Sequence, residues 1–187
     1  MELPVNHLKH AMARGEVVSG IWCNLCSEFA MEVVMGAGLD FVIIDTEHGP
    51  IDLFMLVRLL QASLASKTQP IVRVPWNDQV MIKRVLDAGA QSLLIPMVQT
   101  EEEAKNAVAY TRYPPQGVRG VAATTRATRF GRVKGYTKRV HDELCVLVQI
   151  ETELGLKNLE AIASVEGIDG VFIGPADLHA SLGYLGE

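Results

Sequence analysis

The sequence has few cysteines, no cluster of basic residues and no long uninterrupted apolar run. Three cysteines among 187 residues are too few, and odd in number, for a disulfide framework, so we expect a reducing, cytoplasmic environment. The net charge of −5 and the scattered lysines and arginines argue against a nucleic-acid partner. Charge or glycine interrupts every apolar run well before the ~18 residues of a membrane span, and no basic segment opens the chain, so we expect no membrane partner.

Three chemical motifs are also missing or incomplete. Cys23 and Cys26 have the spacing of a metal or redox pair, but no second pair or nearby histidine completes a zinc set, so neither role is favoured. No G-x-G-x-x-G follows the first predicted strand, which disfavours a doubly wound dinucleotide-binding sheet. No lysine stands at the carboxyl ends of the predicted strands, which disfavours catalysis through a Schiff base.

Short apolar strands alternating with helices are the main pattern that the sequence does contain. Hydrophobic residues make up 49% of the chain and the mean hydropathy is +0.19, which is typical of a globular protein. Such alternation predicts parallel strands joined by right-handed crossovers. The predicted strands cover 17–22, 41–45, 70–75, 92–98, 144–150 and 170–173. The predicted helices cover 6–14, 28–36, 53–65, 77–86, 101–111 and 154–163, with a long loop over 113–135.

Polar residues follow nearly every predicted strand, which favours a (β/α)8 TIM barrel over a doubly wound sheet. A TIM barrel typically takes ~250 residues, so we predict that residues 1–187 form a single, incomplete barrel domain with the first six β–α units. Residues 183–187 resemble an interrupted loop. We therefore expect that residues 1–187 alone do not form a stable, active monomer, because open strand edges favour aggregation or pairing with another chain.

The stretch from residue 41 to 50 places three ionisable residues directly after a buried strand. Asp45, Glu47 and His48 come where the chain leaves the predicted sheet. Ligands bind at the carboxyl ends of parallel strands, so this position favours chemistry. His48 beside two carboxylates would act as a base near neutral pH, with Asp45 fixing its tautomer. The alternative is a solvated turn in which Asp45 caps the following helix.

Arg73 lies inside a predicted strand, where a guanidinium is costly unless an anion pairs with it. The anion is either a substrate oxyanion or, in a purely structural ion pair, Asp45 or Glu47. Gln149 is a further polar residue at a strand end.

Two carboxylates, Glu151 and Asp177, follow neighbouring predicted strands. Hard oxygen ligands with open positions left to water suit Mg²⁺ or Mn²⁺ better than zinc. Alternatively, each residue caps the turn or helix that follows it. The turn after the last strand also has free backbone N–H groups, at Ala176 and Asp177, that are suited to a substrate carboxylate.

Six runs in this order resemble the HpcH/HpaI family of metal-dependent (class II) pyruvate aldolases, from about residue 17 to the end. They are IDTEHGP (44–50), PIVRVP (70–75), LIPMVQ (94–99), RYPPQGVRG (112–120), LVQIE (147–151) and GVFIGPADL (170–178). The resemblance implies a (β/α)8 barrel, assembled as a homo-oligomer, usually a hexamer of paired subunits. It also implies a divalent cation, Mg²⁺ or Mn²⁺ with Co²⁺ as a further option, held by Glu151 and Asp177.

The resemblance assigns a role to each remaining polar residue. His48 would be the base, supported by Asp45, and Arg73 would stabilise an enolate. The other implied roles are a water anchor beside the metal for Glu47, a pyruvyl contact for Gln149, and substrate binding for the loop arginine Arg126. Thr46 departs from the family pattern, because glycine is expected there.

The implied activity is that of a carbon–carbon lyase that cleaves 4-hydroxy-2-oxo acids to pyruvate and an aldehyde, in the catabolism of aromatic compounds or sugar acids. Two alternatives stay open. One is a lyase or transferase of the same barrel type that uses phosphoenolpyruvate or an acyl-CoA. The other is a non-catalytic, truncated assembly module.

Overall fold

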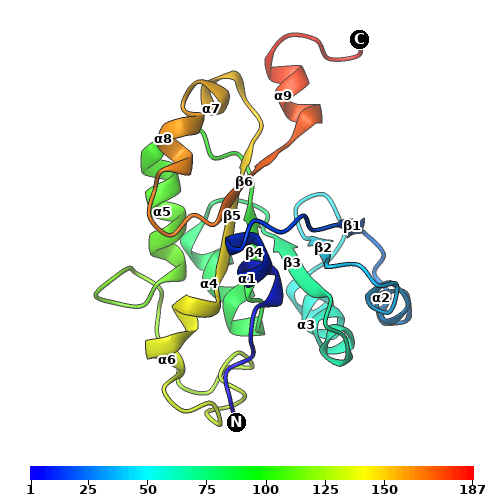
Figure 1. The fold of residues 1–187 in the computed structure, drawn as a ribbon, viewed down its shortest axis with the longest axis vertical. Coiled ribbons are helices and arrows are strands. Elements are labelled where there is room, and N and C mark those ends of the chain that lie inside the picture. The colour runs from blue at the N-terminus through cyan, green and yellow to red at the C-terminus, as the bar shows by residue number, and fades with distance from the viewer.

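A computed structural model describes residues 1–187 as a curved, six-stranded parallel sheet with helices packed around it (Figure 1). The order of the strands in the sheet is their order in the chain, without the reversal of a doubly wound fold. The predicted partial (β/α)8 barrel is therefore confirmed. The strands are β1 (Gly20–Cys23), β2 (Phe41–Asp45), β3 (Gln69–Arg73), β4 (Ser92–Ile95), β5 (Cys145–Ile150) and β6 (Gly170–Ile173).

Nine α-helices and two 3-10 turns connect the strands or flank them. None of the helices has the length and apolar character needed to cross a membrane. The helices are α1 (His7–Ala13), α2 (Glu28–Met35), α3 (Leu53–Ala62), α4 (Gln79–Ala88), α5 (Glu101–Thr111), α6 (Tyr136–Arg139), α7 (Glu153–Lys157), α8 (Leu159–Ala163) and α9 (Pro175–Ser181), and the 3-10 turns are η1 (Ser63–Ala65) and η2 (Val140–Glu143).

Side-chain caps fix where these helices begin. Asp52 accepts the N–H of Met55 at the start of α3, and Thr152 accepts the N–H of Gly155 at the start of α7. No side chain caps α9. The alternatives in which the carboxylates of the predicted site serve as helix caps are therefore wrong.

The structure differs from the predicted elements at two places. The helix predicted over 154–163 is two short helices, α7 and α8, separated at Asn158. The region after β6, predicted as a turn and an open loop, forms helix α9, with a proline in its first turn where a missing N–H costs nothing. The predicted loop over 113–135 is confirmed and ends at the short helix α6.

Apolar side chains pack on both faces of the sheet. The larger cluster, of 31 buried residues, lies between the strands and the helices. A smaller cluster on the inner face contains Ile43, Ile71, Leu94 and Leu147, together with Leu8 of α1. Side chains alternate between the faces of a strand, so the inner position after Ile43 on β2 is the last residue of that strand. The inner face is therefore apolar near the amino ends of the strands and polar at their carboxyl ends.

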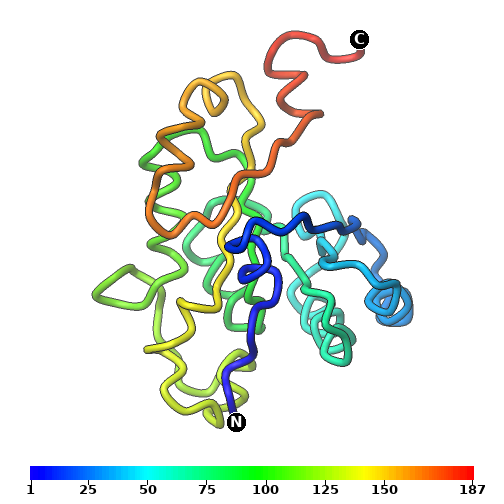
Figure 2. Tube along the Cα trace, viewed as in Figure 1, coloured from blue at the N-terminus to red at the C-terminus, as the bar shows by residue number.

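The sheet curves enough to bring its two outer strands together on the inner side. The rings of Trp22 on β1 and Phe172 on β6 meet edge to face, with centroids 5.9 Å apart. Figure 2 shows the amino terminus and the loop that precedes α6 at one end of the molecule and the carboxyl terminus at the other. The carboxyl ends of the strands, where β6 leads into α9, are at this second end.

Candidate active site

Asp45 and Arg73 form a buried, two-pronged ion pair at the carboxyl ends of β2 and β3. The two residues are opposite each other in the register of the parallel strands. Arg73 donates from Nε to Oδ1 of Asp45 at 2.9 Å and from Nη2 to Oδ2 at 2.8 Å. Burial acts against the charged carboxylate, but the hydrogen bonds and charge of Arg73 hold the pKa of Asp45 below its ordinary value. The ion pair that the sequence left as an alternative for Arg73 is present.

A second carboxylate and an aromatic ring complete the surroundings of the guanidinium. Nη1 of Arg73 lies 3.1 Å from Oε2 of Glu47. The guanidinium carbon is 4.4 Å from the centre of the Trp22 ring, a cation–π contact that the sequence reasoning missed. The available signal was an aromatic residue at the end of the first predicted strand. Arg73 is thus held in place on several sides.

Asp45 also shapes the turn that follows β2. Its Oδ1 accepts the backbone N–H groups of Glu47, at 3.1 Å, and of His48, at 3.3 Å. The predicted support of the His48 ring by Asp45 is not present, because the Asp45 carboxylate bonds Arg73 and these two backbone N–H groups and makes no hydrogen bond to the ring. The side chain of His48 is exposed at the rim. Burial raises the pKa of Glu47, although the charge of Arg73 opposes the rise.

Glu151 is a buried carboxylate that has no cationic partner within ion-pair distance. It is 3% exposed and directly follows β5. Its Oε1 accepts a hydrogen bond from Nε2 of Gln149, with 2.5 Å between the two atoms. Its Oε2 accepts one from the backbone N–H of Met97, with 2.9 Å between nitrogen and oxygen. Met97 has a φ of 55°, a strained conformation for a residue with a side chain, and it aims this N–H at the carboxylate. Burial raises the pKa of Glu151, and the charge of Asp177 raises it further.

The turn after β6 lies directly against Glu151. A Cβ on Gly174 would lie 2.5 Å from Oε1 of Glu151, so glycine is needed for this approach. Ala176 and Asp177 follow in the first turn of α9, where helix N–H groups have no intrahelical partner. The side chain of Asp177 is exposed and close enough to affect the pKa of Glu151.

The donor set around Glu151 fits a hard divalent cation. A buried carboxylate with a raised pKa beside a second carboxylate is stabilised by added positive charge. The chain groups no three histidine, cysteine, aspartate or glutamate side chains as a complete ligand set. Two carboxylates with the remaining positions left to water and substrate are the arrangement that Mg²⁺ commonly uses.

Arg126 does not lie at this end of the strands. Its Nη1 donates to the carbonyl oxygen of Ala88 at 2.6 Å, at the end of α4 and before β4 begins. A strand of four residues spans roughly 13 Å, so the guanidinium is beyond reach of the carboxyl ends within one chain. The predicted substrate contact of Arg126 in the same chain is therefore wrong. The loop folds back on α4, where the N–H of Ala127 also bonds the carbonyl of Asp87 at 3.1 Å.

The other predicted site residues come together. Asp45, Glu47 and Arg73 are in direct contact, Gln149 contacts Glu151, and the charges of Arg73 and Glu151 affect each other's pKa. A parallel, barrel-type sheet with acidic, basic and imidazole groups gathered at its carboxyl end defines a TIM-barrel enzyme.

Comparison with known proteins identifies the family. A model of the HpcH/HpaI aldolase/citrate lyase family matches residues 18–187, and the chain belongs to this family. It is 56% identical over 187 residues to a pyruvate aldolase of Rhizobium etli, covering all of this chain and 74% of that protein. It is 50% identical over 183 residues to a 4-hydroxy-2-oxo-heptane-1,7-dioate aldolase of Escherichia coli, covering 97% of this chain and 70% of that protein.

Among solved structures, an HpcH/HpaI aldolase/citrate lyase family protein from Burkholderia cenocepacia superimposes with a TM-score of 0.95. The two sequences are 40% identical, and the match covers 98% of this chain and 74% of that chain. The partial barrel described above is therefore also found in a solved structure of the family.

Proposed function

We propose that this protein is a class II pyruvate aldolase, which cleaves 4-hydroxy-2-oxo acids to pyruvate and an aldehyde with the help of a divalent cation. The observation that carries the proposal is that a buried Glu151 without a cationic partner and an Arg73 fixed by Asp45 both lie at the carboxyl ends of the strands. Relatives with these names, at 50% identity or more, support the same reaction.

Glu151 and Asp177 would hold the cation, Mg²⁺ or Mn²⁺. The cation would supply Lewis-acid polarisation of the 2-oxo carbonyl. Gln149 and the backbone of Met97 fix the orientation of the Glu151 carboxylate. Glu47, whose pKa is raised by burial, lies beside Arg73 and is suited to orient water there.

Arg73 has the position and charge to stabilise the enolate oxygen of pyruvate as the C3–C4 bond breaks. Removing one such pre-oriented donor commonly costs about 3–4 kcal/mol of transition-state stabilisation. Its planar group is already fixed by Asp45 and Trp22, so little reorganisation is needed when negative charge develops. Gln149 and the N–H groups of Ala176 and Asp177 would orient the pyruvyl end of the substrate.

His48 is our candidate for the base. The 4-hydroxyl proton would pass to its imidazole, directly or through water, and the C3–C4 electron pair would move into the enolate while the aldehyde carbonyl forms. Protonation of the enolate at C3 then yields pyruvate. The exposed side chain of His48 suits proton exchange with solvent, and the ring does not depend on Asp45 for its orientation.

We propose a small 2-oxo acid as the part of the substrate that these residues bind. A lyase or transferase acting on acyl-CoA or phosphoenolpyruvate would also need a stabilised enolate. The named aldolases support the aldol reaction over this second candidate. A reaction that requires CoA, or that releases phosphate, would favour the lyase or transferase over the aldolase.

We further propose a homo-oligomer, with the hexamer as the expected form. The outer faces of α2 and α3 expose Phe29 (81%), Val33 (73%) and Phe54 (73%), which are large apolar side chains. Such exposed groups commonly mark protein–protein contacts. The mass of the protein in solution tests this proposal.

Pyruvate release from 4-hydroxy-2-oxoheptanedioate tests the reaction. We expect excess EDTA to abolish release and Mg²⁺ or Mn²⁺ to restore it. Glu151→Gln should weaken metal binding strongly, whereas Glu153→Gln, which removes a surface carboxylate two residues away, should leave it unchanged. Full turnover in EDTA with verified metal-free protein would exclude the class II assignment.

A further inference from the structure

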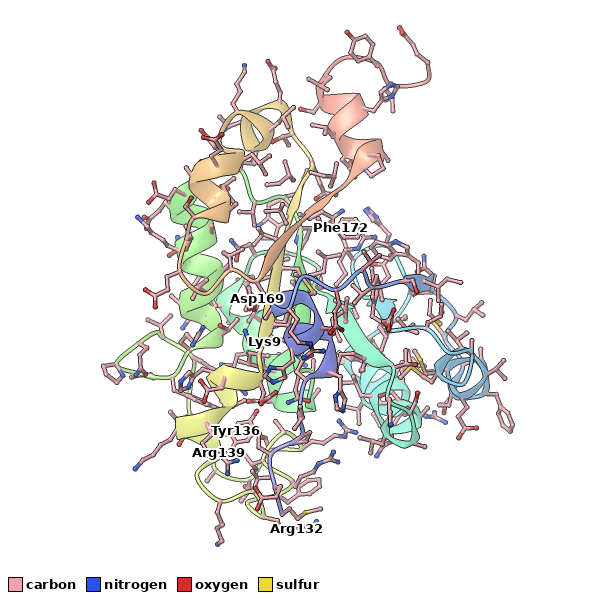
Figure 3. All side chains as sticks on the ribbon, in the orientation of Figure 1. Lys9, Arg132, Tyr136, Arg139, Asp169 and Phe172 are labelled. Atoms are coloured by element: carbon pink, nitrogen blue, oxygen red, sulfur yellow. The ribbon has the colours of Figure 1, made fainter.

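A cavity lies at the opposite end of the strands from the candidate active site. Its volume is about 280 Å³, and it is lined by the amino-terminal segment, the end of α3 with η1 and the segment to β3, the turn before β4 and the loop that leads into α6. Tyr136, one of its lining residues, lies at this end of the molecule in Figure 3, near the amino-terminal segment. The aldol reaction as proposed makes no use of this cavity.

The charged groups that line this cavity are all cationic or potentially cationic. They are Lys67, Arg126 and Arg129, with His7 as a further titratable group, and no aspartate or glutamate lines the cavity. None of these four residues takes part in an ion pair of the chain. In a protein with a net charge of −5, this is a local excess of positive charge without a counter-charge.

Arg126 is the best-fixed of these groups. Its Nη1 donates to the carbonyl of Ala88, and Gly89, with a φ of 105°, leaves room for the guanidinium, because a Cβ there would lie 2.6 Å from Nη1. Its Nη2 is buried and has no hydrogen-bond partner. Burial and the neighbouring Arg129 lower its pKa, as expected for a cation whose charge is not compensated. A bound anion would supply the missing counter-charge.

Two other polar side chains around the cavity, Thr68 and Gln91, bond the protein backbone and so hold the walls of the cavity in place. The hydroxyl of Thr68 bonds the carbonyl oxygens of Met35 and Leu39, and Nε2 of Gln91 bonds the carbonyl of Pro4. These donors are already used within the protein. The cationic side chains of Lys67 and the two arginines therefore carry the recognition, and a ligand must bring negative oxygen atoms to them.

We propose that this cavity binds a phosphate group, either as free phosphate or as part of a small phosphorylated metabolite. A planar guanidinium can donate two parallel hydrogen bonds to two oxygens of a phosphate group. Lys67 adds a positive charge on a flexible side chain. The volume is slightly below the ~300 Å³ at which pockets for drug-sized ligands begin, so a phosphate group with a small organic part fits. The proposal does not depend on the reaction assigned to the other end of the barrel.

Titration calorimetry with inorganic phosphate tests the site, with a sulfate titration as a second oxyanion. Arg126→Gln should weaken phosphate binding by at least about tenfold, because charge-assisted bonds to an arginine are among the stronger polar contacts. Lys67→Gln should weaken it several-fold. Lys67 is exposed, so its substitution leaves the fold intact even if Arg126→Gln disturbs the loop. Lys134→Gln is the matched control, since it removes an exposed lysine of the same loop that does not line the cavity.

Two further arms separate the sources of the signal. Pyruvate with Mg²⁺ at saturating concentration should not displace phosphate, whereas displacement would assign the bound phosphate to the catalytic end. Tighter binding of glycerol 3-phosphate than of inorganic phosphate would identify a phosphorylated metabolite as the ligand, and the reverse order would identify free phosphate. Absence of phosphate binding at millimolar concentration, or equal binding by all three variants, would overturn the proposal.

Discussion

Both carboxylate oxygens of Asp45 accept hydrogen bonds from Arg73 across the neighbouring strands β2 and β3. The pair has a structural consequence and a chemical one. Structurally, it neutralises a buried guanidinium, which would destabilise the fold if it were left unpaired. Chemically, it fixes the plane of the guanidinium, so that the charge is already in position when a substrate oxyanion develops.

Asp45→Asn should therefore lower both stability and turnover. Breaking one side of a buried ion pair commonly costs about 3–5 kcal/mol, and we expect a loss in that range together with a fall in kcat of about 10²-fold. Chemical denaturation and steady-state kinetics on folded enzyme provide the two measurements. Asp52→Asn is the control: it removes a carboxylate but keeps a good helix cap, so it should be nearly neutral.

Acid should destabilise the protein through the same pair. The pKa of Asp45 is lowered in the folded state, so its stabilising contribution is complete above its ordinary value of 3.8 and is lost as the pH falls through the lower, folded-state pKa. Melting temperatures between pH 5 and pH 2 should fall less steeply for Asp45→Asn than for the natural sequence. Parallel curves for the two proteins would show that this carboxylate is not a source of the acid sensitivity.

Much of the fold was predictable because the strands are short apolar runs ended by polar residues. The positions of the strands and the capping residues followed from local chemistry, as at Thr100, whose capping box with Glu103 is present. Helix α9 was missed because Gly174 and Pro175 together indicate a turn, although proline is also favoured in a first helical turn. The break at Asn158 was missed because the apolar pattern continues through it.

The candidate site was predictable in its membership but not in its contacts. Strand ends identify Asp45, Arg73 and Glu151, since parallel strands bring them to one edge of the sheet. The choice of Arg73 over the His48 ring as the partner of Asp45 depends on strand register, which the sequence does not reveal. Arg126 was misplaced because a residue in a long loop has no periodicity that assigns it to either end of the barrel.

Glu151→Gln should increase the stability of the metal-free protein while removing its response to metal. The pKa of Glu151 is raised by burial, so the ionised form destabilises the fold at pH values above this raised pKa, and acidification through it relieves the penalty. An uncharged amide has no such penalty. Gln149 Oε1 is free of partners and can accept the new N–H after the Gln149 amide rotates.

Thermal melts with EDTA and with Mg²⁺ at pH 7 would measure both effects. The natural sequence should gain melting temperature with Mg²⁺, since a ligand that binds only the folded state stabilises it. The Glu151→Gln protein should melt higher in EDTA and gain little from metal. An equal metal-induced gain in both proteins would mean that the cation binds elsewhere.

Trp22→Leu should reduce turnover moderately through Arg73. A cation–π contact contributes about 0.5–2 kcal/mol, so we expect a fall in kcat of about 2- to 30-fold with a smaller change in metal affinity. Trp22→Phe keeps an aromatic face and should retain most of the activity. If the leucine and phenylalanine variants behave alike, the ring acts only as packing against Phe172.

Arg73→Lys and Arg73→Ala separate the charge of the side chain from its geometry. Lysine keeps a positive charge beside Asp45 and Glu47 but cannot form the two-pronged pair, so the protein should fold with kcat reduced by about 10- to 100-fold. Alanine leaves both carboxylates unpaired and should lower stability by about 3–5 kcal/mol and kcat by about 10²–10³-fold per folded molecule. Mg²⁺ affinity should change little in either variant, because the proposed ligands are Glu151 and Asp177. An alanine variant that is unstable yet fully active per folded molecule would reduce Arg73 to a structural ion pair and remove the enolate-stabilising role.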